Sequence, residues 1–345
     1  MKTACVILDG RPAHILRIKR VTETRLSSTE EEIMRLEVLP LAEPLGAVVC
    51  GWNPKAELSA QDRTDILQGL RQYQVLVFRG HAQPSDMDLT RFAQNFGDLV
   101  KGSEWFGDIG EYAEILPINN LVDDDGVPMG TGGSAALEWH TDYSYVSTIG
   151  KESFLEAVEL PKSPPQTCFC SQYVAAETLP RKTVDMLRPM RAFHSINYIS
   201  TDTPEASMTS GSMGEHARDE IRAGFMAKKA RNKRQGITRP RIPEAEHPAI
   251  LRHPDSGREI LYVNPGITQY IIGMPRDESD GLLRELHAHS TRPSCVYSHD
   301  WEHGDLVMFD TLGTLHRRDA WDPGERRVMR QLSTLWDPSE KDPSS

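Results

Sequence analysis

Long hydrophobic runs are absent from this sequence of 345 residues. The apolar stretch at residues 4–8 is interrupted by the polar residues 9–12, so it is too short for a signal sequence or a membrane helix. No later segment is long enough to cross a bilayer. We therefore expect a cytoplasmic protein that has no membrane partner.

An excess of positive charge is also absent, since the formal net charge is −11. The basic residues between 228 and 241 have no aromatic residues interleaved with them, as a nucleic-acid surface would require. Cysteines number only five, an odd count, and no secretory signal accompanies them. This composition excludes a disulfide scaffold and a nucleic-acid partner, and it favours reduced thiols.

The chain contains many short β-prone segments and a few amphipathic helices. Ser59 and Pro84-Ser85 are placed to begin two helices, and Gly97 is placed to end the second. The segment 75–78 is typical of a buried strand, 111–117 and 306–309 are predicted as further strands, and 277–290 is predicted as a helix. This pattern predicts a mainly β protein with flanking helices, built on a double-stranded β-helix or jelly-roll core.

We expect three parts in the chain. Residues 1–35 form an N-terminal extension, residues 36–337 form the functional domain, and residues 338–345 form a C-terminal tail. The segment 200–245 is rich in Ser, Thr, Gly, Met and basic residues, which is typical of an excursion from the core. We predict that this insertion is a lid over an active site, although a solvated excursion without function stays open.

The stretch 138–145 contains a histidine and an aspartate two residues apart. Side chains alternate between the two faces of a strand, so a strand here would direct His140 and Asp142 to one face and Thr141 to the other. Tyr143 and Tyr145 would then face away from the metal side and pack in the core. The pair His140 and Asp142 is half of a two-histidine, one-carboxylate metal site.

His316 follows the predicted strand 306–309 and supplies the missing histidine, and Arg327 begins the next predicted strand. His140-Thr141-Asp142, His316 and Arg327, in this order, resemble the Fe(II)- and 2-oxoglutarate-dependent dioxygenases of the taurine dioxygenase (TauD/TfdA) type. The segments 45–47, 75–80, 92–97, 253–254, 261–264 and 304–307 are similar to further family segments. The resemblance covers roughly residues 36–337.

The resemblance implies an iron site formed by His140, Asp142 and His316, with 2-oxoglutarate and O2 as cosubstrates. It implies that Arg327 binds the distal carboxylate of 2-oxoglutarate, because a guanidinium pairs with a carboxylate through two parallel hydrogen bonds. Thr167 is the expected second donor, and Asn120 is expected to line the substrate or cosubstrate pocket. The reaction would release succinate and CO2 while a small molecule is hydroxylated, desaturated or otherwise oxidised.

One departure from the family pattern concerns the substrate. The family commonly has a second arginine where this chain has Gln331, so an anionic, taurine-like substrate would lose a counter-charge. This difference favours a neutral or bulkier substrate, such as a natural-product intermediate of secondary metabolism. Trp105 and Phe106 lie in a glycine-rich stretch and are further candidates for substrate contact. Asp142 is present, which disfavours a halogenase.

Two other functional classes are compatible with the same ligands. A catalytically silent sensor would bind the metal and 2-oxoglutarate without turnover, and a zinc hydrolase would act without O2. The zinc hydrolase would leave Arg327 unexplained. The sequence also leaves open whether the protein is a homo-oligomer.

Overall fold

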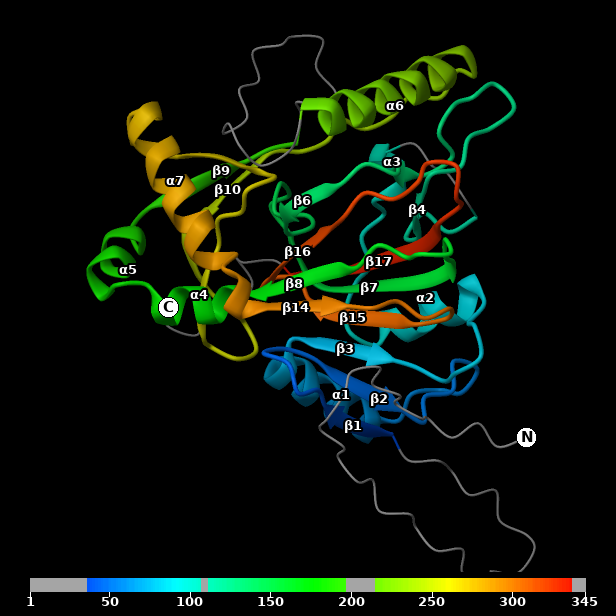
Figure 1. The fold of residues 1–345 in the computed structure, drawn as a ribbon, viewed down its shortest axis with the longest axis horizontal. Coiled ribbons are helices and arrows are strands. Elements are labelled where there is room, and N and C mark those ends of the chain that lie inside the picture. The colour runs from blue at the N-terminus through cyan, green and yellow to red at the C-terminus, as the bar shows by residue number, and fades with distance from the viewer. Residues whose placement is uncertain (1–35, 107–110, 197–214, 337–345) are drawn as a thin grey trace, which may run out of the picture.

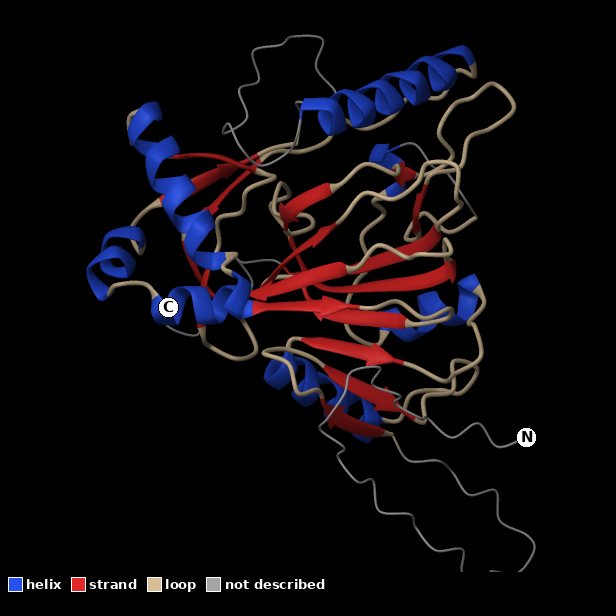
Figure 2. Ribbon diagram, viewed as in Figure 1, coloured by secondary structure: helices blue, strands red, loops and turns tan. Residues whose placement is uncertain are grey.

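The computed structural model of the protein describes residues 36–106, 111–196 and 215–336. The predicted N-terminal extension 1–35 and C-terminal tail 338–345 lie outside the described residues, as does the first part of the predicted insertion 200–245. Strands occupy the centre of the molecule, and helices lie around them (Figure 2). No described helix is both long and apolar enough to cross a membrane.

The largest sheet has eight strands in the order β1-β2-β3-β15-β7-β17-β4-β5. Most neighbours in it are antiparallel, but β2 with β3 and β4 with β5 are parallel. The strands are β1 (Glu37–Pro40), β2 (Ala47–Cys50), β3 (Val75–Phe78), β4 (Leu116–Asn119), β5 (Thr131–Gly132), β7 (Ile149–Glu159), β15 (Leu306–Asp310) and β17 (Val328–Trp336).

A four-stranded sheet in the order β14-β8-β16-β6 packs against the large sheet. Its strands are β6 (Leu137–His140), β8 (Thr167–Ser171), β14 (Val296–His299) and β16 (Thr314–Arg318). Phe169 and Tyr297 of this sheet share one buried cluster with Val77 and Phe309 of the large sheet. The two sheets therefore pack face to face, which confirms the predicted jelly-roll core.

Two small sheets and a helix form a subdomain beside this core (Figure 1). The strands are β9 (Arg191–His194), β10 (Ala245–Pro248), β13 (Thr268–Ile271), β11 (Ile250–Arg252) and β12 (Glu259–Leu261). Helix α7 (Arg276–Ser290) packs on them through Leu283 and Leu286, which confirms the predicted helix at 277–290. The short helices α4 (Gln172–Thr178) and α5 (Arg181–Leu187) complete this part of the molecule.

Helices α1 (Ala60–Tyr73) and α2 (Asp86–Gln94) cover the outer face of the large sheet. Their predicted caps are present, since Ser59 and Ser85 each accept a hydrogen bond from the backbone three residues later. The alternation of strand β15 explains the two layers. Leu306 and Met308 pack toward these helices, while Val307 and Phe309 pack toward the four-stranded sheet.

Two sequence predictions of strands are wrong in their position. The predicted strand 138–145 ends at His140, and the chain then turns, with Tyr143 in the left-handed region at φ 57°. The strand predicted at 111–117 lies instead at Leu116–Asn119. Of the 200–245 insertion, the described part is mostly one long helix, α6 (Glu215–Arg234), which runs above α3 (Ser103–Phe106) in Figure 1.

Candidate metal centre and its cavity

Three candidate ligands meet where β6 and β16 pair. His140 and His316 are direct partners in the antiparallel register, so their side chains leave the sheet on one face, with ring centroids 4.2 Å apart. Asp142 follows in the turn after β6. One ligand atom from each of the three residues lies within 4.8 Å of the others, which is compact enough for one metal ion.

The protonation states suit a divalent cation. His140 Nδ1 lies 2.6 Å from the carbonyl oxygen of Glu138, which can only accept, so Nδ1 carries the proton. His140 Nε2 then faces Asp142, 3.8 Å from its Oδ1. Burial lowers the pKa of His316 well below its usual value, so this ring is neutral. Neutral imidazoles are the form that binds metals.

Asp142 supplies the negative charge of the site. Its Oδ2 lies 3.7 Å from His316 Nε2 and accepts a hydrogen bond of 2.6 Å from Gln331 Nε2. Burial raises the pKa of Asp142, because its charged form is poorly solvated here. A cation bound between the carboxylate and the two rings would remove this penalty, so the donor set fits a divalent metal ion.

The turn after His140 directs Asp142 toward β16. Thr141 points the other way, and its hydroxyl donates to the carbonyl oxygen of Thr311. Tyr143 reverses the chain in its left-handed conformation. Gly150 leaves room for this reversal, because a Cβ there would lie 3.2 Å from Tyr143 Cβ and 3.3 Å from the Asp142 carbonyl oxygen.

A cavity of about 170 Å³ opens at the three ligand candidates. Its walls are mostly apolar, and Asp142 is the only acidic residue among the described residues that line it. The apolar lining consists of Phe106, Leu116, Ile118, Leu137, Tyr143, Tyr145, Leu155, Ile196, Ile221 and Ile267. The remaining polar lining residues include Thr167, Arg318, Arg327 and Gln331.

Arg327 is the most deeply buried charged residue of this cavity, with 1 % of its surface exposed. Burial lowers its pKa to about 10, so it remains charged at neutral pH. Its Nε atom has no hydrogen-bond partner among the described residues. The ring centroid of Trp321 lies 5.4 Å from the central carbon of this guanidinium. A buried cation of this kind requires an anion, and the cavity can supply space for one.

Thr167, on β8, also lines the cavity. Its hydroxyl oxygen accepts a hydrogen bond of 2.9 Å from the indole of Trp301, which leaves the hydroxyl hydrogen for a second partner. The structure therefore brings Thr167 and Arg327 together with the three ligand candidates in one cavity.

Asn120 does not line this cavity. Its amide donates to the carbonyl oxygens of Pro323 and Glu325, and its oxygen accepts a hydrogen bond of 3.0 Å from the backbone of Arg327. It therefore holds the loop that leads into β17. Asn120 thus contacts the backbone of Arg327 itself, and its place in the substrate or cosubstrate pocket stays a prediction.

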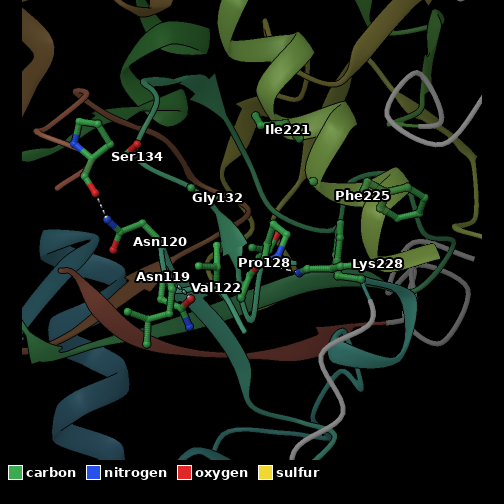
Figure 3. A pocket seen from close by; sticks show the side chains of 16 residues that line it. Asn119, Asn120, Val122, Pro128, Gly132, Ser134, Ile221, Phe225 and Lys228 are labelled. Atoms are coloured by element: carbon green, nitrogen blue, oxygen red, sulfur yellow. Dashed lines mark hydrogen bonds between the residues drawn. The ribbon is translucent and has the colours of Figure 1, made fainter. Parts of the chain in front are cut away.

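Asn120 lines an adjoining cavity of about 220 Å³, shown in Figure 3. Helix α6 contributes Ile221, Phe225 and Lys228 to one wall, and the segment 128–134 contributes another. The two cavities share four lining residues, namely Phe106, Thr131, Gly132 and Ile221. They are thus neighbours, separated by side chains of α3, α6 and the glycine-rich segment.

The candidate substrate residues have different positions. Phe106 lines the metal cavity, whereas Trp105 packs beside Tyr143 and Tyr145, with ring centroids 6.2 and 6.3 Å away. The two tyrosines are buried in a core cluster, as predicted. The prediction that they face away from the metal side is wrong, because both line the metal cavity. The turn at 141–148 removes the alternation on which that prediction depended.

Arg318 is a site residue that the sequence analysis missed. It is two residues after His316 on β16, so both side chains leave the strand on the same face. Its guanidinium donates to the carbonyl oxygen of Gly132 at 3.1 Å and also to that of Ala135. Trp321 lies 4.4 Å from it. Side chains two positions apart on a strand share a face, so the spacing from His316 could have identified Arg318 from the sequence.

The fold and the donor set define a non-haem metalloenzyme with two histidines and one carboxylate on a jelly roll. Residues 37–333 match the family described as Taurine catabolism dioxygenase TauD, TfdA family, and the chain belongs to this family. The match confirms the predicted resemblance and the predicted enzyme class, a 2-oxoglutarate-dependent dioxygenase.

Among relatives, the chain is 36% identical to "Pentalenolactone F synthase" of Streptomyces avermitilis over 85% of this chain and 92% of that one. It is 32% identical to "Alpha-ketoglutarate-dependent 2,4-dichlorophenoxyacetate dioxygenase" of Burkholderia sp., over 81% of this chain and 87% of the relative. A crystal structure of a taurine dioxygenase from Burkholderia xenovorans matches with a TM-score of 0.66 at 21% identity, covering 89% of this chain and 92% of that one. The structural likeness supports the jelly-roll fold.

Proposed function

We propose that this enzyme binds Fe(II) through His140, Asp142 and His316 and uses 2-oxoglutarate and O2 to oxidise an unactivated C–H bond of a small molecule. Succinate and CO2 are the coproducts. The observation that carries the proposal is one cavity that contains the compact His-Asp-His cluster and the buried guanidinium of Arg327. A metal alone would explain the first feature but not the second.

The roles of the side chains follow from their positions. His140, Asp142 and His316 would hold the iron ion, which when bound would supply the oxidising chemistry with 2-oxoglutarate and O2. Arg327 pairs with the distal carboxylate of 2-oxoglutarate, and the hydroxyl of Thr167 donates a second hydrogen bond to it. Thr167 lies on β8 and Arg327 directly precedes β17, where Asn120 holds its backbone, so the two groups would orient the cosubstrate relative to the ligands.

The cavity walls indicate the substrate class. Ten aromatic and aliphatic side chains line the metal cavity. Gln331 is uncharged, and its amide donates a hydrogen bond to Asp142. A compact, largely apolar molecule fits such walls better than a taurine-like sulfonate. We therefore assign a natural-product intermediate as the substrate class, in accord with the similarity to pentalenolactone F synthase.

Helix α6 has the position of a lid in this proposal. Ile221 and Phe225 pack on the cluster that contains Tyr143 and Tyr145, beside the metal cavity. Lys228 donates to the carbonyl oxygen of Gly130, and Arg231 forms an ion pair of 3.0 Å with Asp123. These contacts join the helix to the segment 123–130 across the adjoining cavity. A cytoplasmic location without nucleic-acid or membrane partners is part of the same proposal.

The test measures succinate formation with Fe(II), 2-oxoglutarate and O2 for a panel of candidate substrates. The panel contains a precursor of pentalenolactone F, 2,4-dichlorophenoxyacetate and taurine. We expect succinate in step with oxidation of the precursor of pentalenolactone F, and no stimulation by taurine.

The alternatives predict different outcomes of the same test. Binding of 2-oxoglutarate without succinate from any compound would indicate a silent sensor. Hydrolysis without O2 by the zinc-loaded protein would indicate a zinc hydrolase. Either result would overturn the proposal.

A further inference from the structure

Gln331 is held rigidly opposite the candidate ligands. It lies on β17, where its backbone pairs with Leu155 of β7 on one side and Leu116 of β4 on the other. Only 5 % of its surface is exposed, and its side chain lines the metal cavity. The hydrogen bond from its Nε2 to Asp142 Oδ2, at 2.6 Å, joins the large sheet to the turn after β6.

Asp142 needs such a contact more than the two histidines do. His140 and His316 are fixed by the register of paired strands, and His140 is held further by the Glu138 carbonyl oxygen. Asp142 lies in a turn, where no strand ladder fixes its backbone. The torsion that orients a carboxylate plane is broad, so packing and hydrogen bonds must select one orientation.

The chemistry of the amide determines its direction. An ionised carboxylate only accepts hydrogen bonds, so the nitrogen of Gln331 must face Asp142 and the amide oxygen must face elsewhere. A neutral donor also leaves the full negative charge on the carboxylate. An arginine at this position would add a positive charge beside a cation site, and a glutamate would add a second negative charge.

We propose that Gln331 is a positioning residue that fixes the orientation of the Asp142 carboxylate for metal binding. Its amide occupies Oδ2 and leaves Oδ1, on the side of His140, for the ion. Hydrogen bonds to the outer oxygen of a ligating carboxylate typically change metal affinity by about 10- to 100-fold. This inference rests on the proposed metal site, and it replaces the predicted substrate role of Gln331 with a role toward the ligand.

The experiment measures the dissociation constant of Mn(II) by electron paramagnetic resonance, on the full-length protein without cosubstrate. Gln331→Met keeps the length of the side chain but removes the donor, and we expect Mn(II) binding to weaken by about 10- to 100-fold. Gln331→Asn keeps the amide but is one methylene too short for the 2.6 Å contact, so the same weakening is expected. The visible absorption of the Co(II) form should change with it, because a carboxylate free to rotate alters the coordination.

The matched control is Gln172→Met. Gln172, at the start of α4, is also buried, at 1 % exposure. Its amide contacts Cys170 Sγ of β8 and not a ligand candidate. This variant should bind Mn(II) with wild-type affinity. Mn(II) binding by both Gln331 variants at wild-type affinity would overturn the inference, provided that circular dichroism shows them folded. Failure of the wild-type protein to bind Mn(II) would instead overturn the proposed function itself.

Discussion

The two ends of the cavity are built in different ways. At the metal end, the side chains of His140, His316, Thr167 and Gln331 belong to strands that are paired with neighbours in the sheets. At the other end, the walls come from α3, α6 and the turns at 128–134. Strand pairing fixes a side chain to within a fraction of an ångström, whereas helices on a surface can shift as units.

The two ends of the cavity therefore have different roles. Chemistry requires fixed distances, and the two candidate histidine ligands lie on paired strands, while Arg327 directly precedes β17. Selection of a substrate requires shape, so the side chains of the outer end are mainly apolar and partly exposed. Changes at the metal end should therefore abolish turnover, while changes at the outer end should alter which molecule is oxidised.

The strongest test of the metal end is His316→Ala. Removal of one of three ligands should reduce turnover by far more than the roughly 100-fold caused by loss of outer-shell partners. Succinate formation and Mn(II) affinity measure the effect. The exposed His303 provides the control, because His303→Ala removes a histidine that does not line the cavity. Normal turnover by His316→Ala would show that another residue holds the metal.

Arg327→Gln tests the cosubstrate site at the same end. Loss of two charge-assisted hydrogen bonds should raise the KM for 2-oxoglutarate by about 100-fold and leave Mn(II) affinity nearly unchanged. Arg326→Gln is the matched control, since this exposed neighbour pairs with Glu159 at 3.0 Å outside the cavity. An equal rise in both variants would contradict the assignment of Arg327.

The packing behind the metal end should make stability depend on pH. His247 is 4 % exposed, its Nε2 donates to the Val146 carbonyl oxygen behind the Asp142 turn, and burial lowers its pKa to about 4. The unfolded chain takes up the proton near pH 6.5, but the folded chain does not. Stability is therefore complete above pH 6.5 and decreases as the pH falls toward 4, by about 2 kcal/mol at pH 5.

Urea unfolding at pH 7 and pH 5 measures this contribution. In His247→Gln the amide can still donate to Val146, but the side chain no longer titrates, so the difference between the two pH values should shrink by that amount. His303→Gln, at an exposed position, should keep the wild-type difference. An unchanged difference in His247→Gln would show that other groups cause the pH dependence.

The smallest effect is expected at the outer end. Ile221→Ala removes an apolar side chain of α6 that lines both cavities. Loss of part of this contact should raise the KM for the substrate roughly five-fold. The KM for 2-oxoglutarate should stay constant. Lys229→Ala, at an exposed position on the same helix, should change neither value. A larger effect on 2-oxoglutarate than on substrate would contradict the division between the two ends.

The sequence predicted the cluster of His140, Asp142 and His316 because the residue types and their order are specific. It also predicted the buried strands and the two serine caps, since these depend on local periodicity and local hydrogen bonds. The same local rule failed at 138–145, where β-prone residues precede and follow Asp142. Nothing in that stretch indicates that Tyr143 adopts a left-handed backbone, because the space for it comes from Gly150.

The roles of Asn120 and Gln331 could not be found by local rules. Asn120 reaches the loop before β17, and Gln331 reaches a turn on the opposite sheet. Both contacts depend on which strands pair and in which register, and these are properties of the folded molecule. Arg318 could have been predicted from the sequence, because it lies two residues after His316 on the same strand.

The left-handed conformation of Tyr143 has a consequence for the protein before it binds a metal. A large aromatic residue in this region costs about 1–3 kcal/mol, and here that cost falls on the residue next to Asp142. The burial of Tyr143 and Tyr145 in a core cluster offsets this cost. An ion that binds only this conformation of the turn would add its binding free energy to the turn's local stability. Iron binding would in this way stabilise the turn that presents Asp142.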